Sequence, residues 1–463
     1  MDRSVRAEVR TALAGKDYVR AKALIDPCLE QGADDVDALC LGALVYWQGA
    51  VDAEQSASML RRARGLAPES AGVLTLSAQL ELHFGRLAAA CDFAGRALAI
   101  DSGAITAYVV LTRALPASVT DEVLQAMIAL ADRPDLRRAR QRHLLNAIGR
   151  VFDARADYDR AFDYFSRSNS LAERQYDRSR REAFLAQGTS IFDAKFVEDR
   201  KSFGARGSGT VFIIGMPRSG STLLEQALVA HPLIDSCGES YAVGAINRAL
   251  YLEASDAAKQ TGAFSHLPLL GRDAIARAAR AYLDLTSAVL KKPGRTHQLD
   301  KRLSNFLHLP LIGAMFPDAR FLHAHRHPLD LCLSCYMQDF DEHFYTNDLG
   351  DLAHFYGIYR RYMQLWSGLY GEAIRHCSYE RFVASPEAET RAALAFAGLS
   401  WDEACAAPHA GERFVMTASA AQIRAPVHGG AVGRWRNYEK HLAPLIDGLG
   451  GHGAVENLHE SPV

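Results

Sequence analysis

The most constraining feature of the chain is the segment Gly215 to Thr222, which reads GMPRSGST and follows the apolar run TVFIIG. The run is typical of a buried strand, and STLLEQALVAH directly after it is typical of a helix. Gly215 and Gly220 allow a tight turn in which successive N–H groups face one concavity, and the helix N-terminus adds a partial positive charge. The segment predicts a phosphate-binding loop at the carboxyl end of a parallel strand.

This loop lacks the lysine of nucleoside-triphosphate-binding loops. The Walker pattern GxxxxGK[ST] requires Lys after its last glycine, but Ser221 follows Gly220, and Arg218 lies inside the loop instead. Because this lysine is the most informative residue of the Walker pattern, its absence argues against a kinase or a nucleoside triphosphatase. A plain glycine turn is the alternative, but it leaves several polar side chains without a role, namely Arg218, Ser219, Ser221 and Thr222.

The second half of the chain alternates between short apolar runs and amphipathic segments. Further strands are predicted at 297–300 and 319–326, and further helices at 272–292, 305–316 and 329–340. Such alternation indicates a parallel sheet with helices on both faces.

Residues 1 to about 190 contain a helical repeat. A small residue recurs with gaps of 35, 34, 36 and 35, at Ala21, Ser56, Ala90, Ala126 and Ala161. A period near 34 predicts helices packed closely in antiparallel pairs, whose concave surface can hold a peptide or partner. Residues 85–101 and 156–171 resemble tetratricopeptide repeats, whereas Pro116 and Arg133 depart from the pattern in the fourth unit. A generic alanine-rich bundle is the alternative.

Composition excludes several classes of protein. The 463 residues have room for two or three domains, and a net charge of −2 argues against a nucleic-acid or anionic-membrane partner. The N-terminus is too charged for a signal peptide, and no stretch approaches the length of a membrane span. Eight cysteines form no disulfide framework, which favours the cytoplasm. We interpret Cys332 and Cys335 as small buried residues on a helix, with a zinc site as the second reading.

Residues 217–223 read PRSGSTL and resemble the 5′-phosphosulfate loop P-[RK]-S-G-T-T-L of sulfotransferases that use 3′-phosphoadenosine 5′-phosphosulfate (PAPS). The similarity runs from about Val211 to Trp435. It is greatest to protein-tyrosine sulfotransferases and to bacterial proteins that join tetratricopeptide repeats to a sulfotransferase domain. The resemblance implies an α plus α/β protein: a helical-repeat domain at 1–190, a three-layer α/β sulfotransferase domain at 205–450, and a tail at 451–463.

The resemblance also implies roles for single residues. Arg326 and Ser334, eight residues apart, would grip the 3′-phosphate, and a strand-end arginine can fork a phosphate bidentately. Glu239 in Cys-Gly-Glu would be the catalytic base, and Lys301 the catalytic lysine. The catalytic set is thus Glu239, Lys301, Ser419 and Arg218. The cofactor-binding set is Arg218, Ser219, Gly220, Ser221, Thr222, Leu223, Arg326, Ser334, Tyr379, Ser419 and Arg434.

Each of these residues has a structural alternative. Arg326 could be salt-bridged at the sheet edge, Glu239 could cap a helix, Lys301 could be a solvated charge and Tyr379 a core residue. In the C-terminal loop the family has a Lys before Pro, where this chain has Ala425, with Arg424 one place earlier.

Two further patterns are expected to be structural. His323, His325 and His327 alternate along a predicted strand and would share a face. No carboxylate or cysteine at ligand spacing supports a metal site there, so core or cofactor-flanking histidines are the preferred reading and no metal is expected. The aromatic stripe within 355–366 has helical spacing typical of a core.

The implied reaction moves a sulfuryl group from PAPS to an acceptor hydroxyl. The sequence leaves the class of acceptor open. It could be a protein tyrosine or another protein group held by the repeats, or a small metabolite or glycan. In tyrosine sulfotransferases, basic residues after the catalytic glutamate help to bind acidic peptides. The corresponding positions here are Ala242 and Ile246. The alternative from another class is a non-catalytic repeat scaffold with a nucleotide-binding domain. Four intact residues argue against it, Glu239, Lys301, Arg326 and Ser334.

Overall fold

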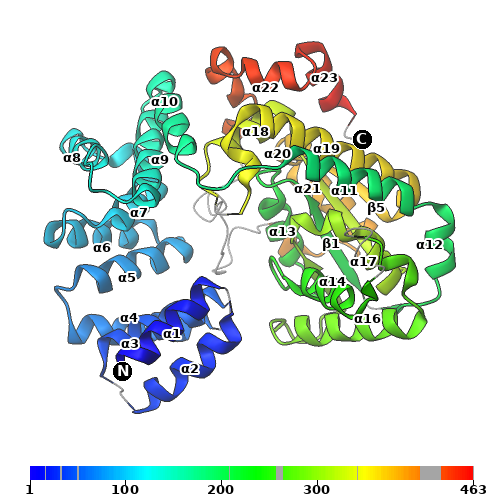
Figure 1. Cartoon of the computed structure of the whole chain (residues 1–463), viewed down its shortest axis with the longest axis horizontal. Helices are drawn as coiled ribbons and strands as arrows, with labels where there is room; N and C mark the ends of the chain where they lie inside the picture. Colours follow the sequence, from blue (N-terminus) through cyan, green and yellow to red (C-terminus); the bar gives the residue numbers. More distant parts are fainter. Residues whose placement is uncertain are drawn as a thin grey trace. The chain divides into compact units, whose positions relative to one another are not determined.

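The computed structural model describes residues 1–15, 17–31, 34–49, 52–207, 209–256, 264–340, 342–406 and 429–461. They fall into two compact units, residues 1–171 and residues 172–406 with 429–461 (Figure 1). The first unit is helical and the second contains a sheet, so the expected α plus α/β fold class is confirmed. None of the described helices combines the length and apolar character that a bilayer crossing requires.

The first unit is a succession of short helices. They are α1 Arg3–Ala14, α2 Tyr18–Gln31, α3 Val36–Gln48, α4 Ala53–Leu66, α5 Ala71–His83, α6 Leu87–Ile100, α7 Ile105–Ala114, η1 Pro116–Ser118, α8 Asp121–Ala131, α9 Arg138–Ala154 and α10 Tyr158–Ser170. Consecutive helices pack in pairs, α1 with α2, α3 with α4, α5 with α6 and α9 with α10. Several begin at a side chain that accepts a backbone N–H, as Asp52 does for α4 and Asp157 for α10.

The recurring small residues lie where paired helices approach each other. Ala21, Ser56, Ala90 and Ala161 are fully buried, and the Ser56 hydroxyl donates to the Ala43 carbonyl at 2.8 Å, which ties α4 to α3. The prediction is wrong at Ala126, which is exposed. Helix α8 instead buries the face that carries Leu124, Met127 and Ala131, whose spacing of three and four residues is that of one helix face, and Ala126 lies off that face.

The second unit is built on a five-stranded parallel sheet in the order β2-β3-β1-β4-β5. The strands are β1 Thr210–Gly215, β2 Ile234–Ser236, β3 His297–Asp300, β4 Arg320–His325 and β5 Ile374–Ser378. β1 is buried along its whole length and pairs with β3 and β4, which explains its uninterrupted apolar sequence. The predicted strands at 210–215 and 297–300 are confirmed.

Helices surround this sheet and follow its strands. They are α11 Arg178–Ile191, α12 Ala194–Arg200, α13 Ser221–Val229, α14 Ala242–Glu253, η2 Leu267–Leu269, α16 Arg272–Ser287, η3 Leu303–His308, α17 Leu309–Met315, α18 Pro328–Tyr336, η4 Phe344–Asn347, α19 Leu349–Tyr370, η5 Gly371–Ala373, α20 Tyr379–Ala384, α21 Pro386–Phe396, η6 Glu403–Ala406, η8 Gly429–Ala431, η9 Arg434–His441, α22 Ala443–Gly448 and α23 His452–Glu460.

Three predicted helices differ from the structure, and one of them, expected at 329–340, ends at Tyr336. The helix expected at 305–316 is divided into η3 and α17, because Pro310 cannot donate a backbone hydrogen bond and starts a new helix at its first turn. The helix expected at 272–292 ends at Ser287. Cys332 and Cys335 are buried on α18 as predicted, and the aromatic stripe of α19 is core.

The division between the two units falls after Leu171, before the boundary expected near residue 190. Helix α11 packs against α19 of the second unit. Leu185 is buried, and Arg361 donates to both carboxylate oxygens of Glu182 at 3.1 and 3.0 Å. Helix α23 likewise packs against α18, so the expected tail at 451–463 contains a helix attached to the second unit.

This packing predicts that the position of a truncation matters. A fragment 172–463 should unfold cooperatively, whereas a fragment 192–463, which lacks α11, should unfold at a lower temperature. Losing buried Leu185 alone removes about 1.5–3 kcal/mol of apolar burial. Thermal unfolding followed by circular dichroism measures both. Equal midpoints for the two fragments would show that α11 is not part of the second folding unit.

Candidate functional site

The residues singled out in the sequence follow the carboxyl ends of the parallel strands. Gly215–Thr222 comes after β1, Glu239 after β2, Lys301 after β3, Arg326 after β4 and Tyr379 after β5. Parallel strands end at the same edge of a sheet, so all five segments lie along that edge. The chain leaves β1 for strands on one side and later returns to strands on its other side, which makes β1 the topological switch point where such folds bind ligands.

The loop after β1 presents the start of helix α13. Gly220 is the N-cap residue of α13, with φ at +90°, and Arg218 also has a left-handed backbone at φ +69°. The N–H groups of the first turn of a helix point out of its N-terminal end, and here they belong to Ser221, Thr222 and Leu223. The side chain of Leu223 packs against the apolar core, so only the backbone of that residue is oriented for an anion.

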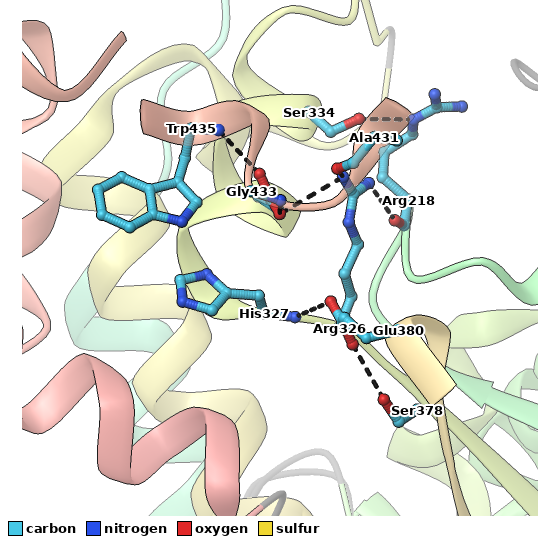
Figure 2. Close-up of polar contacts among 10 residues, drawn as sticks. Arg218, Arg326, His327, Ser334, Ser378, Glu380, Ala431, Gly433 and Trp435 are labelled. Atoms are coloured by element: carbon cyan, nitrogen blue, oxygen red, sulfur yellow. Dashed lines mark hydrogen bonds and ion pairs between the residues drawn. The ribbon is translucent and has the colours of Figure 1, made fainter. Parts of the chain in front are cut away.

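Two arginines lie next to each other beside this loop (Figure 2). Arg218 Nε donates to Ser334 Oγ at 3.0 Å, and Arg326 Nη1 donates to the Arg218 carbonyl at 3.4 Å. Burial, together with the smaller effect of the nearby cations of Arg326 and Arg434, lowers the pKa of Arg218 to about 10. The structure therefore brings Arg218, Arg326 and Ser334 together, and it places Ser334 against Arg218.

Two polar groups of this cluster have no hydrogen-bond partner among the described residues. They are the buried hydroxyl of Ser219 and Nε of Arg326. A buried polar group that lacks a partner costs free energy. Both therefore fit an anionic ligand that would accept their hydrogen bonds.

Tyr379 lies between the loop and Arg326. The guanidinium carbon of Arg326 is 4.8 Å from the centre of the Tyr379 ring. A Cβ added at Gly220 would lie 2.5 Å from the same ring. The adjacent Glu380 has a structural role, since it accepts from the backbone N–H of His327 at 2.9 Å and from Ser378 Oγ at 3.0 Å.

A buried carboxylate attaches the C-terminal segment to this cluster. Asp330 on α18 accepts from the N–H of Gly433 at 2.6 Å and from that of Trp435 at 2.9 Å, and its carboxylate is 3.9 Å from Arg326. Arg326 also donates to the Ala431 carbonyl. Because Asp330 holds the residues on both sides of Arg434, it determines where that predicted cofactor-binding residue lies.

The three alternating histidines do not all share a face. Strand β4 ends at His325, and His327 lies beyond it as the N-cap residue of α18, stacked on Trp435 with ring centres 5.6 Å apart (Figure 2). His323 is fully buried and its Nδ1 is 2.7 Å from Nδ1 of His376. Burial lowers the pKa of His323, and it lowers that of His325 to about 4. Within the described part of the chain, no group of three or more potential ligands is placed to hold a metal ion.

On the other side of β1, Lys301 and Glu239 form an ion pair. Lys301 Nζ donates to Glu239 Oε1 at 2.9 Å and lies 3.5 Å from Glu225 Oε2. Lys301 is buried, whereas about half of the Glu239 side chain is exposed. Burial disfavours the ammonium, but the two carboxylates outweigh it and raise the pKa of Lys301. The pair joins a buried fixed cation to a carboxylate that solvent can reach.

The sequence did not point to two carboxylates of the site, and one residue that it did predict is outside the described part of the chain. Asp330 and Glu225 are buried beside Arg326 and Lys301. The only sequence signal for Glu225 was a single acidic residue in the otherwise apolar helix STLLEQALV. Ser419 lies outside the described residues.

Comparison with known proteins adds an independent observation. Residues 210–403 match the sulfotransferase family model. These residues contain β1 to β5 and all the segments gathered at the sheet edge except the C-terminal one. The match supports sulfuryl transfer as the general activity of this part of the chain.

Individual relatives are more distant. An uncharacterized protein of Aquifex aeolicus (strain VF5) is 29% identical over 400 residues, which cover 85% of this chain and 52% of that protein, so the chain spans about half the length of this relative. The sulfotransferase domain of the Synechococcus PCC 7002 olefin synthase has 20% identity and a TM-score of 0.38, covering 55% of this chain and 94% of that one. Sulfotransferase STF9 of Mycobacterium avium has 16% identity and a TM-score of 0.31, covering 75% and 97%.

The close approach of Gly220 to Tyr379 predicts a cost for any side chain there. Gly220→Ala should lower the free energy of unfolding by about 1–3 kcal/mol, because a left-handed backbone is strained for alanine and the new Cβ meets the Tyr379 ring. Gly357→Ala is the matched control, since Gly357 lies within α19 with open space around it. Helix propensity predicts a gain of about 0.5–1 kcal/mol there. Urea denaturation of both variants checks this; an unchanged Gly220→Ala would contradict the geometry.

Proposed function

We propose that the second unit is a PAPS-dependent sulfotransferase that transfers a sulfuryl group to an acceptor hydroxyl, with Glu239 as general base. The observation that carries this proposal is the arrangement on the two sides of the loop after β1. A cluster of guanidinium groups suited to phosphates lies on one side, and an ammonium–carboxylate pair suited to proton transfer lies on the other.

The residues present fit a ligand with two separate anionic groups. The amides at the start of α13, Ser219 and Arg218 would hold the phosphosulfate end, in the manner of helix N-termini that bind anions. Arg326 and Ser334 would hold the 3′-phosphate, with Tyr379 beside the nucleoside. Burial, and to a smaller extent the neighbouring cations, lowers the pKa of Arg218, and a bound anion would supply the counter-charge that this buried guanidinium needs.

In the proposed reaction, PAPS supplies an activated sulfuryl group and a leaving phosphate. Glu239 takes the proton of the acceptor hydroxyl while the acceptor oxygen bonds to sulfur. The bond between sulfur and the bridging phosphate oxygen breaks, and that oxygen keeps the electron pair. Arg218 and Lys301, together with Ser419, would stabilise the negative charge on the leaving and equatorial oxygens, as preorganised donors do in phosphoryl transfer.

The acceptor and the role of the helical unit complete the proposal. We infer that α1 to α10 are tetratricopeptide-like repeats that could present a protein hydroxyl, such as a tyrosine, to the second unit. The paired helices and the buried small residues at their contacts support the repeat assignment. A small metabolite or glycan as acceptor would leave the repeats free for another partner.

The guanidinium cluster predicts selective loss of affinity. Arg326→Ala should weaken binding of adenosine 3′,5′-bisphosphate by about 1.5–3 kcal/mol, the usual contribution of a charge-assisted contact. It should have little effect on adenosine 5′-phosphate, which lacks the 3′-phosphate. Arg375→Ala, which removes an arginine paired with Glu389, is the control. Calorimetry measures the affinity of wild type and of both variants for each nucleotide, and equal losses for both nucleotides in Arg326→Ala would exclude this role for Arg326.

The exposed carboxylate of Glu239 predicts a purely catalytic defect. Glu239→Gln should lower turnover by about 10²–10⁴, the usual contribution of a positioned base, and leave bisphosphate affinity nearly unchanged. Bisphosphate release with a surrogate phenol is the assay. Acidic phenols should be affected least, since they lose a proton readily. Glu253→Gln at the exposed end of α14 is the control. Wild-type turnover in Glu239→Gln, with chemistry limiting, would assign the base elsewhere.

A further inference from the structure

Lys301 has a second carboxylate partner besides the proposed base. Glu225 on α13 lies with Oε2 3.5 Å from Lys301 Nζ, and only 11% of its side chain is exposed. Glu239 approaches the same ammonium at 2.9 Å from the loop after β2. The two carboxylates thus differ in exposure although they share one cation.

Glu225 is itself held in place. Ser236 Oγ donates to Glu225 Oε1 at 2.6 Å, and the same hydroxyl accepts from the N–H of Gly238 at 2.9 Å. The N–H of Lys301 donates to the Gly238 carbonyl at 2.8 Å. These bonds connect α13, the end of β2 and the end of β3 in one closed network, with Glu239 as the next residue along the chain.

We propose that Glu225 is a positioning residue that keeps the Lys301 ammonium in place while Glu239 accepts the proton of the acceptor. This inference rests on the function proposed above. Before transfer, Lys301 faces two anions. Once Glu239 is protonated it is neutral, and its attraction for Lys301 is largely lost. Glu225 does not touch the acceptor, so its charge is unaffected and continues to hold the ammonium beside the reacting oxygens.

Other charged groups near Lys301 do not replace Glu225. Among the described residues, the carboxylates that face its ammonium are Glu225 and Glu239. The preceding residue, Asp300, points to the other face of β3, where its carboxylate accepts from Tyr282 at 3.1 Å and from Asn305 at 3.2 Å. Burial raises the pKa of Asp300 to about 7. Removing Glu225 should therefore lower the pKa of Lys301, because a single carboxylate would then remain to offset the effect of burial on the ammonium.

The first test measures Lys301 directly and needs no activity. NMR titration of the lysine ammonium in the full chain, assigned with Lys301→Arg, should show a lower pKa for Lys301 in Glu225→Gln than in wild type. Glu389→Gln is the control, because Glu389 is a partly buried carboxylate that pairs with Arg375 and Arg381. An unchanged Lys301 pKa in Glu225→Gln would overturn the proposal.

A second test uses turnover with the surrogate phenol. In Glu225→Gln, kcat should fall about 10- to 100-fold, as expected when a catalytic group is displaced, while KM for the donor changes little. The alkaline limb of the pH profile should move to lower pH, and it should not move when the same substitution is made in Lys301→Arg. A residue that merely stabilises the fold would leave the alkaline limb in place, and that result would also overturn the proposal.

Glu225→Asp covers the case in which Glu225→Gln does not fold. This variant keeps the carboxylate, but its side chain is shorter by one methylene and places the charge farther from Lys301. The pKa of Lys301 should therefore fall by less than in Glu225→Gln, and the alkaline limb should lie closer to that of wild type. An identical Lys301 pKa in wild type and Glu225→Asp would contradict the proposal. Failure of the proposed function is a separate outcome: wild type would then bind no bisphosphate and transfer no sulfuryl group, whereas the NMR titration would still report on Glu225.

Discussion

Two guanidinium groups, those of Arg218 and Arg326, lie beside each other at the end of a parallel sheet, and much of the second unit serves to hold them there. Bringing like charges together away from water is unfavourable unless hydrogen bonds and counter-charges offset the cost. Ser334, the carbonyl of Arg218 and the carboxylate of Asp330 provide those partners. The positive charge that remains defines the site, because an anion is the ligand that would complete it.

The sheet topology divides the site into two halves with different chemistry. β1 stands at the centre with β3 and β2 on one side and β4 and β5 on the other. Residues after β4 and β5, with Arg218 from the loop after β1, build the cationic half, while residues after β2 and β3 build the Lys301–Glu239 pair. Helix α13 belongs to both halves, since its first turn faces the loop and Glu225, one turn later, reaches Lys301. The groups proposed for anion binding and for proton transfer are thus joined through one short helix.

Much of this organisation could be predicted because it depends on local sequence. The apolar run of β1, the glycines of the loop and the alternation of strands and helices are local patterns, and the structure agrees with them. Predictions failed where a neighbour in space overrode a pattern. Ala126 keeps the repeat spacing but is exposed, because helix α8 packs through the face that carries Leu124, Met127 and Ala131. His327 keeps the alternation of β4 but stacks on Trp435, since the strand ends before it.

The sequence by itself determined the fold class, the position of the glycine-containing loop after β1 and the identity of the side chains around it, because strand and helix periodicity and the conformational freedom of glycine act over a few residues. Only the tertiary structure decided which of those side chains share a partner. Asp330 holds the backbone on both sides of Arg434 across more than a hundred residues of sequence, and Glu225 reaches Lys301 from another element. Such partners are chosen by the need to satisfy buried charges. That need arises only after packing has removed the charges from water.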